Sequence, residues 1–262
     1  MRKILSIFSI LFVFYPAFSG IVRKHIPDRM VVLTFDDATA SQYSVVAPLL
    51  KEYGFGATFF ICEFPPNFAD TTKYMNWRQI RELDHMGFEI ANHTRNHPAI
   101  AKLPDDKIVE QLSYIERKCD SIKIRRPVTF AYPGYSLSLP VMKILQDKGY
   151  LFSRAGGERP YDPATDHPLL IPSWAMNSDN KPMIMNALKE AHDGKIVVLT
   201  IHGVPDTEHP WVNTTPELFK EYLQYLKENH FEVVSLRDLA KYIKVEEAMK
   251  ILTPDLTKKL KN

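Results

Sequence analysis

The chain has 262 residues, of which 45% are hydrophobic and 24% are charged. This composition supplies a sizeable buried core and excludes an intrinsically disordered protein. The 33 basic and 31 acidic residues leave a formal charge of +2 without any basic block, so nucleic acid is not an expected partner. Glycine and proline are not periodic and there are only two cysteines, which excludes collagen, disulfide scaffolds and zinc fingers.

The N-terminal segment has the pattern of a secretory signal peptide. Arg2 and Lys3 form a basic start, residues 4–14 form an apolar run, and Ala17-Phe18-Ser19 supplies a small-x-small cleavage site. We therefore predict that residues 1–19 are removed and that the protein is exported, to the periplasm or the extracellular space. An uncleaved membrane anchor is the alternative, although the apolar run is shorter than the ~20 residues that span a bilayer.

From residue 30 onward, short β-branched or aromatic runs alternate with helical stretches, which is typical of a parallel sheet wrapped by helices. Seven strands are predicted, at residues 30–35, 57–61, 88–91, 128–131, 151–153, 196–201 and 231–234. Helices are predicted at about 42–53, 77–86, 105–119, 139–148, 182–192, 216–228 and 236–243. Asn76 and Thr215 occupy positions that favour helix caps.

The repeated strand and helix units define the expected fold class. Seven such units in one chain favour an α/β barrel of the (β/α) type over an open sheet. No linker divides them, so we predict one domain at 20–245 and a C-terminal tail at 246–262 that forms a terminal helix or a loose end. Export would allow Cys62 and Cys119 to pair, and two buried free thiols are an equal alternative.

Polar residues follow three of the predicted strands. Asp36 and Asp37 follow the first, His93 and His97 follow the third, and His202 follows the sixth. A lone aspartate pair usually caps a helix and a lone histidine is usually a core or rim residue. In parallel α/β folds, however, the carboxyl ends of the strands meet at one face, and functional groups gather there.

This combination has the chemistry of a catalytic metal site. Two histidines four residues apart, on a helical turn or a tight loop, can direct both imidazoles to one point, and a carboxylate completes a three-ligand site with an open position. The second aspartate, Asp37, can then bind the metal while the first, Asp36, remains free as a base.

These motifs resemble the polysaccharide deacetylase family, also called NodB-homology domains or carbohydrate esterase family 4. The resemblance covers residues 28–243 and consists of TFDD at 34–37, H-[ST]-x-x-H at 93–97 and a strand that ends in histidine at 197–202. It implies a distorted (β/α)7 barrel, in agreement with the strand count.

The resemblance also implies a role for each residue. Asp37, His93 and His97 would bind a divalent metal, zinc in most members, with Co²⁺, Ni²⁺ or Mn²⁺ as alternatives. Asp36 would be the general base, and His202 would be the general acid that protonates the departing sugar atom.

The third family motif, a strand end of the R-x-P-Y kind, is altered here. The segment reads Ala131-Tyr132-Pro133-Gly134-Tyr135, which puts Gly134 at the expected oxyanion donor with Tyr132 nearby. Ala131 stands where the family has the arginine that orients the base. Arg154, at the end of the fifth predicted strand, is our candidate replacement, and the alternative is that backbone N–H groups and water hold Asp36.

The fourth family motif, an aspartate beside a tryptophan, is Ser173-Trp174 in this chain. The aspartate that orients the acid is therefore missing, and Asp179 and Asp206 are the candidates to replace it. Trp174 and Trp211 are expected either to stack on a sugar ring or to pack in the barrel.

Two further segments are ambiguous. His209 lies either in the mouth of the site or on a surface loop. Residues 64–74 are long for a connection between a strand and a helix, which makes them a candidate substrate lid.

These observations favour an exported, metal-dependent hydrolase that removes N- or O-linked acetyl groups from a carbohydrate. One alternative is hydrolysis of a non-peptide C–N bond in a small amide. The other is a catalytically silent glycan-binding barrel, which Ala131 and the missing fourth-motif aspartate would suit.

Overall fold

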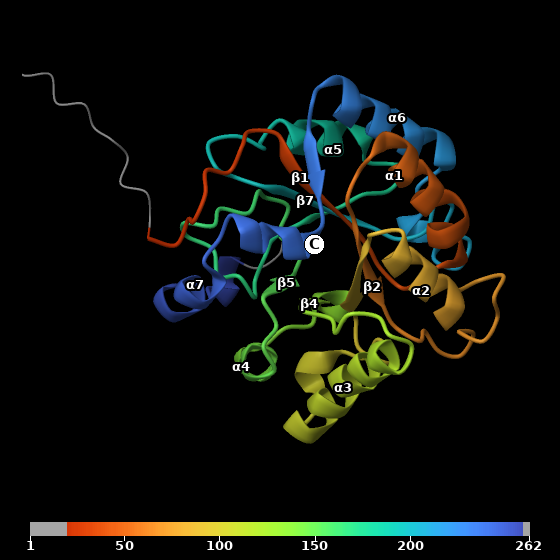
Figure 1. Ribbon diagram of the computed structural model, residues 1–262, viewed down its shortest axis with the longest axis horizontal. Coiled ribbons are helices and arrows are strands. Elements are labelled where there is room, and N and C mark those ends of the chain that lie inside the picture. Colours follow the sequence, from red (N-terminus) through yellow and green to blue (C-terminus); the bar gives the residue numbers. More distant parts are fainter. Residues whose placement is uncertain (1–19, 259–262) are drawn as a thin grey trace, which may run out of the picture.

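The computed structural model describes residues 20–258, which form a curled parallel sheet with helices packed around it (Figure 1). The strands lie in the order β5-β4-β3-β2-β1-β7-β6, and β8 pairs with β1. Their bounds are β1 Met30–Phe35, β2 Thr58–Ile61, β3 Glu89–Asn92, β4 Thr129–Ala131, β5 Phe152–Arg154, β6 Trp174–Ala175, β7 Val197–Ile201 and β8 Glu232–Val234.

Six of the seven α-helices in residues 20–258 lie between strands, as the alternating pattern predicts, and the seventh follows β8. They are α1 Ala47–Tyr53, α2 Trp77–His85, α3 Asp105–Ser121, α4 Leu139–Asp147, α5 Lys181–Leu188, α6 Pro216–Glu228 and α7 Val245–Ile251. A π-helical turn, Gln42–Val46, precedes α1, and a 3-10 turn, Leu236–Lys241, follows β8. The side chains of Asn76 and Thr215 accept backbone N–H bonds at the starts of α2 and α6, which confirms both predicted caps.

The α/β barrel prediction is confirmed, with one strand that the sequence did not reveal. The seven predicted strands are present with their bounds shifted by at most one residue at each end. The additional strand, β6, has only two residues and therefore shows no periodicity. A parallel bridge between Arg154 and Ile171 joins the two ends of the sheet just before β6.

Side-chain alternation along the strands decides what faces the inside of the barrel. On β1, Val31, Leu33 and Phe35 pack in the core beneath the helices, whereas Met30 and Val32 belong to the cluster inside the barrel. Because successive side chains of a strand point to opposite faces, the residue after Phe35 returns to the interior. The same alternation, from Ala91, Phe152 and Val198 in the interior cluster, directs His93, Arg154 and His202 inward.

The start of the C-terminal tail packs against the cluster inside the barrel. Val245 and Ala248 on α7 are buried in the interior cluster together with Ile21 near the start of the described residues.

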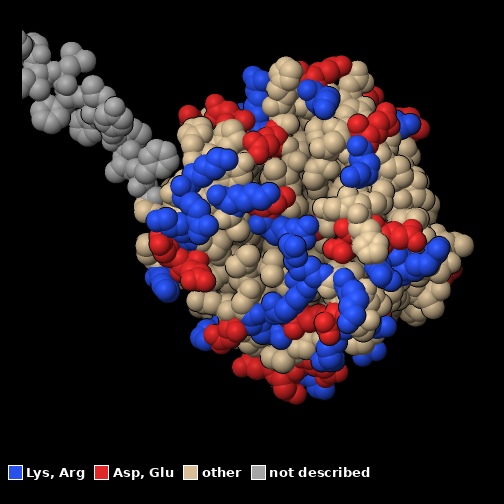
Figure 2. All heavy atoms as spheres, in the orientation of Figure 1, with Lys and Arg blue, Asp and Glu red and all other residues tan. Residues whose placement is uncertain are grey.

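Lysine, arginine, aspartate and glutamate are interspersed on the face in Figure 2, in keeping with the formal charge of +2. The predicted signal peptide lies outside the described residues, and no helix within 20–258 has the length and apolar character needed to cross a membrane. Cys62 and Cys119 are both buried and free.

A buried carboxyl group connects four elements at the base of the sheet. Glu89, 1% exposed at the start of β3, accepts hydrogen bonds of 2.7 Å from the hydroxyls of Thr58 and Thr129. It also accepts one of 2.9 Å from the backbone N–H of Arg237, in the turn after β8. Burial raises the pKa of Glu89, while these donors oppose that rise.

We predict that Glu89→Ala destabilises the fold by about 2 to 4 kcal/mol, because it leaves two buried hydroxyls and one partly buried N–H without an acceptor. Urea unfolding at neutral pH measures the change. Glu246→Ala, at an exposed position on α7, is the matched control and should leave the free energy of unfolding unchanged. Equal stability of the two variants would contradict this account of the network.

Candidate active site

The two aspartates lie at the carboxyl end of β1 and are both 4% exposed. The backbone N–H of Asp36 donates to the carbonyl of Ile201 at 2.9 Å, which extends the pairing of β1 with β7 by one residue. Asp37 has φ +71°, so the chain turns sharply directly after the strand. The amide of Gln42 donates to the backbone carbonyls of Asp36 and His202, which joins the ends of β1 and β7.

The two histidines of the HTRNH motif lie on a tight loop rather than on a helix. His93 continues β3, because its N–H donates to the carbonyl of Ile61 at 3.0 Å. Thr94 and His97 both have positive φ, of 66° and 54°. The hydroxyl of Thr94 accepts the His97 N–H at 3.0 Å, which closes the loop so that the two rings lie 4.8 Å apart between centroids.

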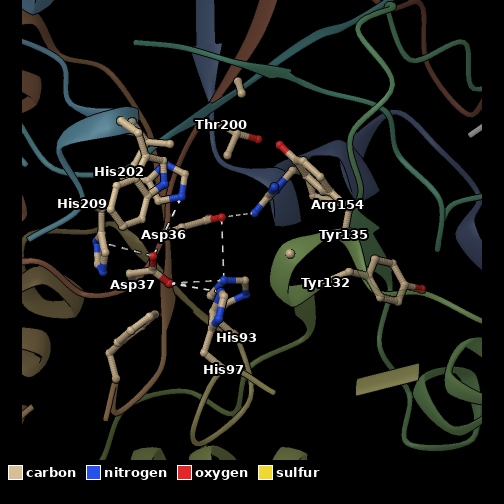
Figure 3. A pocket seen from close by; sticks show the side chains of 15 residues that line it. Asp36, Asp37, His93, His97, Tyr132, Tyr135, Arg154, Thr200, His202 and His209 are labelled. Atoms are coloured by element: carbon tan, nitrogen blue, oxygen red, sulfur yellow. Dashed lines mark hydrogen bonds and ion pairs between the residues drawn. The ribbon is translucent and has the colours of Figure 1, made fainter. Parts of the chain in front are cut away.

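Asp37, His93 and His97 form a group with metal-ligating potential, as predicted (Figure 3). Asp37 Oδ1 lies 3.5 Å from Nε2 of His93 and 3.6 Å from Nε2 of His97. The three ligating atoms all lie within 4.8 Å of one another. Two imidazole nitrogens and one carboxylate oxygen are donors that suit zinc and related divalent ions.

The surroundings of His93 favour the protonation state that a metal ligand needs. Its Nδ1 is 2.8 Å from the carbonyl of Ala131 and therefore donates to it, which leaves Nε2 with a free lone pair. Burial lowers the pKa of His93 to about 4, despite the nearby aspartates, so the ring is neutral at neutral pH. The thiol of Cys62 donates a hydrogen bond of 3.7 Å to Asp37 Oδ1.

Asp36 is held by an arginine from a different strand than in the family pattern. Arg154, 1% exposed on β5, forms an ion pair with Asp36 Oδ2 (Figure 3). Ala131 and Arg154 are direct partners in the pairing of β4 with β5, so the arginine enters the barrel at the same level from the neighbouring strand. Of the two alternatives for holding Asp36, the ion pair with Arg154 is therefore the one present in the structure.

The charge environment keeps Asp36 ionised. Burial alone would raise the pKa of Asp36, but Arg154, His93 and His202 together lower it below its usual value. At neutral pH the carboxylate is therefore able to accept a proton.

The second oxygen of Asp37 faces two further histidines (Figure 3). Asp37 Oδ2 lies 3.8 Å from Nε2 of His202 and 4.0 Å from Nδ1 of His209. His209 is only 7% exposed and lines the cavity, so it belongs to the mouth of the site and not to a surface loop.

Neither candidate aspartate orients His202. Asp179 lies in an exposed turn, and the carboxylate of Asp206 is bonded to His209 instead. Nδ1 of His202 is buried without a hydrogen-bond partner in the described structure. Ser173, at the position of the family aspartate, bonds to the hydroxyl of Thr200 at 2.8 Å and to the carbonyl of Ala155 at 2.6 Å.

These side chains open on one cavity of about 580 Å³. It is lined by Asp36, Asp37, Phe64, His93, His97, Tyr132, Gly134, Tyr135, Arg154, Ala175, Thr200, His202, His209, Trp211 and Val212. Trp211 is 71% exposed, so its indole is available to a ligand at the cavity mouth. Phe64 and Lys73, from the segment predicted as a lid, contact His209 and Glu208 across the mouth.

Two expectations about substrate contacts need correction or refinement. Trp174 is 3% exposed and packs in the core beneath the helices, so we reassign it from sugar contact to packing. Tyr132 lines the cavity, but its hydroxyl donates to the carbonyl of Leu169 at 2.9 Å and its N–H to the carbonyl of Arg154. Gly134 lines the cavity with φ +52°, a conformation that glycine adopts without strain.

Two contributors to the site, Cys62 and Gln42, are not predicted from the sequence. Cys62 follows β2 at the same edge as the other site residues, so the strand-end argument applies to it equally. Gln42 acts through a bond to the carbonyl of His202, which is distant along the chain, and no local pattern indicates such a contact. Asp206 was a candidate partner of His202, but it bonds to His209.

The fold and the site together define a parallel α/β barrel with a candidate metal centre of two histidines and one carboxylate at the carboxyl ends of its strands. The family model for polysaccharide deacetylase matches residues 23–153. The chain therefore belongs to the polysaccharide deacetylase family.

Similar proteins act on several acetylated glycans. A peptidoglycan-N-acetylglucosamine deacetylase of Bacillus cereus is 25% identical over 227 residues, which cover 86% of this chain and 95% of that protein. A chitin deacetylase of Pestalotiopsis is 29% identical over 118 residues, which cover 45% of this chain and 38% of that protein.

Solved structures show the same fold. The family 4 carbohydrate esterase domain of a xylanase from the hindgut metagenome of Trinervitermes trinervoides aligns with a TM-score of 0.59 and 20% identity, covering 82% of this chain and 91% of that one. A family 4 pseudoenzyme from Bacillus anthracis aligns with a TM-score of 0.57 and 21% identity, covering 82% of this chain and 66% of that one.

We predict that His93→Ala and His97→Ala each weaken zinc binding by more than about 100-fold. Loss of a residue that only hydrogen-bonds to a metal ligand typically weakens metal binding by about 10- to 100-fold, and loss of a ligand should weaken it further. Each variant removes a nitrogen of the three-ligand group, whereas His85→Ala, at an exposed position on α2, removes none. Competition with a chromophoric chelator measures the affinity. Wild-type affinity in both ligand variants would contradict this assignment.

Proposed function

We propose that the protein is an exported, metal-dependent hydrolase that removes N- or O-linked acetyl groups from a carbohydrate. The observation that carries the proposal is that the two adjacent carboxylates have different partners. Asp37 faces the two imidazoles of the HTRNH loop, Asp36 is paired with Arg154, and both line the same cavity.

In this proposal Asp37, His93 and His97 hold the metal, with zinc as the expected ion and Co²⁺, Ni²⁺ or Mn²⁺ as substitutes. A divalent ion bound there would supply Lewis-acid activation of water and of the acetyl carbonyl. The neutral state of His93 and its bond to the carbonyl of Ala131 support this assignment, because a ligand nitrogen must be unprotonated.

Asp36 is the proposed general base. Its ionised carboxylate accepts a proton from the attacking water, and Arg154 fixes its orientation. Gly134, in the turn after β4, lines the cavity, and its N–H is the proposed donor to the oxygen of the acetyl group as negative charge develops there. His202 is the proposed donor of a proton to the leaving nitrogen or oxygen of the sugar.

The printed activities of the relatives support a carbohydrate substrate, and so does the exposed indole of Trp211 at the cavity mouth. The signal-like pattern of residues 1–19 supports export, because the peptidoglycan that one relative acts on lies outside the cell membrane.

A catalytically silent glycan-binding barrel is the alternative with a specific observation behind it. Ser173 replaces the family aspartate, and a structural neighbour is described as a pseudoenzyme. The ion pair between Arg154 and Asp36 argues for retained catalysis, because it restores the contact that Ala131 cannot make.

The direct test is acetate release by the zinc-loaded protein from acetylated xylan, chitin oligomers, peptidoglycan and poly-N-acetylglucosamine. We expect release from at least one of these substrates and no release after chelation. Release from none, with zinc bound, would favour the silent barrel. Hydrolysis of small amides alone would support the small-amide alternative.

We predict that Asp36→Asn lowers acetate release by about 10²- to 10⁴-fold while zinc stays bound, because an amide cannot accept the proton. Asp37→Asn is the matched variant one residue along the chain, and it should lose zinc as well as activity. The two are distinguished by activity and metal content measured on the same samples. Loss of zinc in Asp36→Asn would show that the two roles are exchanged.

We predict that removing Arg154 shifts the acidic limb of the pH–rate profile to higher pH. Burial raises the pKa of Asp36 and Arg154 opposes that rise, so without the guanidinium the base is protonated at a higher pH. Arg154→Ala should also destabilise the fold by about 3 to 5 kcal/mol, because it leaves a buried carboxylate unpaired.

Arg154→Lys is the companion variant, since it keeps the charge but loses the planar fork. It should hold the limb nearer to its wild-type position at a reduced rate. An unchanged limb and rate in folded Arg154→Ala protein would contradict the role of Arg154.

A further inference from the structure

A carboxylate and an imidazole form a fixed pair on the segment that follows β7. Asp206, 3% exposed, accepts backbone N–H bonds from Gly203 at 2.9 Å, Glu208 at 3.1 Å and His209 at 2.7 Å. Nδ1 of His209 donates to Asp206 Oδ2 at 3.4 Å. The backbone therefore holds the carboxylate, and the carboxylate in turn orients the ring.

The glycine of the His202-Gly203 dipeptide makes this pair possible. A Cβ atom at Gly203 would lie 2.6 Å from the Cα and 2.7 Å from the Cβ of Asp206. Because real Cβ atoms do not approach other atoms so closely, any larger residue would prevent the segment from folding back. Glycine is therefore required at position 203, because Asp206 has to pack directly against it for the segment to bring His209 back to the cavity.

The pair stands at the edge of the reacting centre. Nδ1 of His209 lies 4.0 Å from Asp37 Oδ2, and the ring packs against Phe64, at 4.9 Å, and Trp211, at 5.6 Å between ring centroids. Since Nδ1 is engaged by Asp206, Nε2 is the ring nitrogen left free to exchange a proton, and His209 itself lines the cavity.

His202 lacks the support that His209 has. Its Nδ1 is buried and without a partner in the described structure, and the residue at the family position for its aspartate, Ser173, bonds to Thr200. An imidazole that must give up a proton works best when a second group fixes its tautomer and orientation. In this chain the carboxylate that fixes an imidazole in this way is that of Asp206, and its partner is His209 and not His202.

We propose that the Asp206–His209 pair is a second acid–base unit of the cavity, which shares leaving-group protonation with His202. This inference rests on the proposed deacetylase function. As water adds to the acetyl carbon, its proton goes to Asp36. The bond from the acetyl carbon to the sugar nitrogen or oxygen then breaks, its electron pair stays on that atom, and Nε2 of His209 supplies the proton. His209 regains a proton from solvent, and Asp36 releases one.

The test compares a substrate whose leaving group needs a proton with one whose leaving group does not. The first is the acetylated glycan that gives the fastest acetate release, and the second is 4-nitrophenyl acetate, whose phenolate departs unprotonated. For His209→Gln we expect kcat on the glycan to fall by about 10²-fold, within the usual range for general acid catalysis. Hydrolysis of 4-nitrophenyl acetate should stay within about 3-fold of wild type, because proton donation is not required there.

Two further variants separate this role from a structural one. Asp206→Asn keeps the shape of the side chain, and it should reproduce the same selective loss to a smaller extent. His192→Gln, at an exposed histidine before β7, is the control and should leave both rates unchanged. Zinc content and thermal unfolding are measured for every variant.

The outcomes are distinguishable. Equal losses on both substrates in His209→Gln, no loss on either, or a higher KM with unchanged kcat would each overturn the inference while leaving the deacetylase proposal intact. A zinc-loaded wild-type protein that hydrolyses 4-nitrophenyl acetate but none of the glycans would overturn both.

Discussion

Two adjacent carboxyl groups are buried inside the barrel, and the rest of the site depends on the partners that the fold gives to each of them. Asp36 and Asp37 are each 4% exposed, and burial of an unpaired charge is strongly unfavourable. The fold gives the two groups different partners. Asp36 is paired with a guanidinium, and Asp37 lies among imidazole nitrogens that suit a shared cation. The different partners are what allow neighbouring residues of the same type to take different roles.

The ion pair between Asp36 and Arg154 also shows how the family architecture tolerates a displaced residue. Ala131 and Arg154 pair directly between β4 and β5, so an arginine on either strand enters the barrel at one level. The carbonyl of Ala131 meanwhile accepts the Nδ1 proton of His93. The position where the family has an arginine thus orients His93, a candidate metal ligand, through its backbone carbonyl.

Much of this site was predictable because period-two alternation and strand ends are written in the local sequence. Asp36, His93 and His202 are the residues that alternation directs inward just past β1, β3 and β7, and Arg154 is the inward residue at the end of β5. The packing of Trp174 in the core could not be told from sugar contact in the sequence, because a two-residue strand carries no periodic signal. The environment of His209 depends on a segment that folds back through Gly203, and such long-range contacts leave no local pattern.

A crystal structure of the zinc-loaded protein at neutral pH tests most directly whether Asp36 and Asp37 have different roles. Anomalous scattering at the zinc edge locates the ion independently of the protein atoms. We predict an ion bound by Asp37, His93 and His97 at about 2.0 to 2.2 Å, with Asp36 still paired to Arg154 and outside the coordination sphere. An ion bound by Asp36, or an ion elsewhere with this group empty, would contradict this prediction.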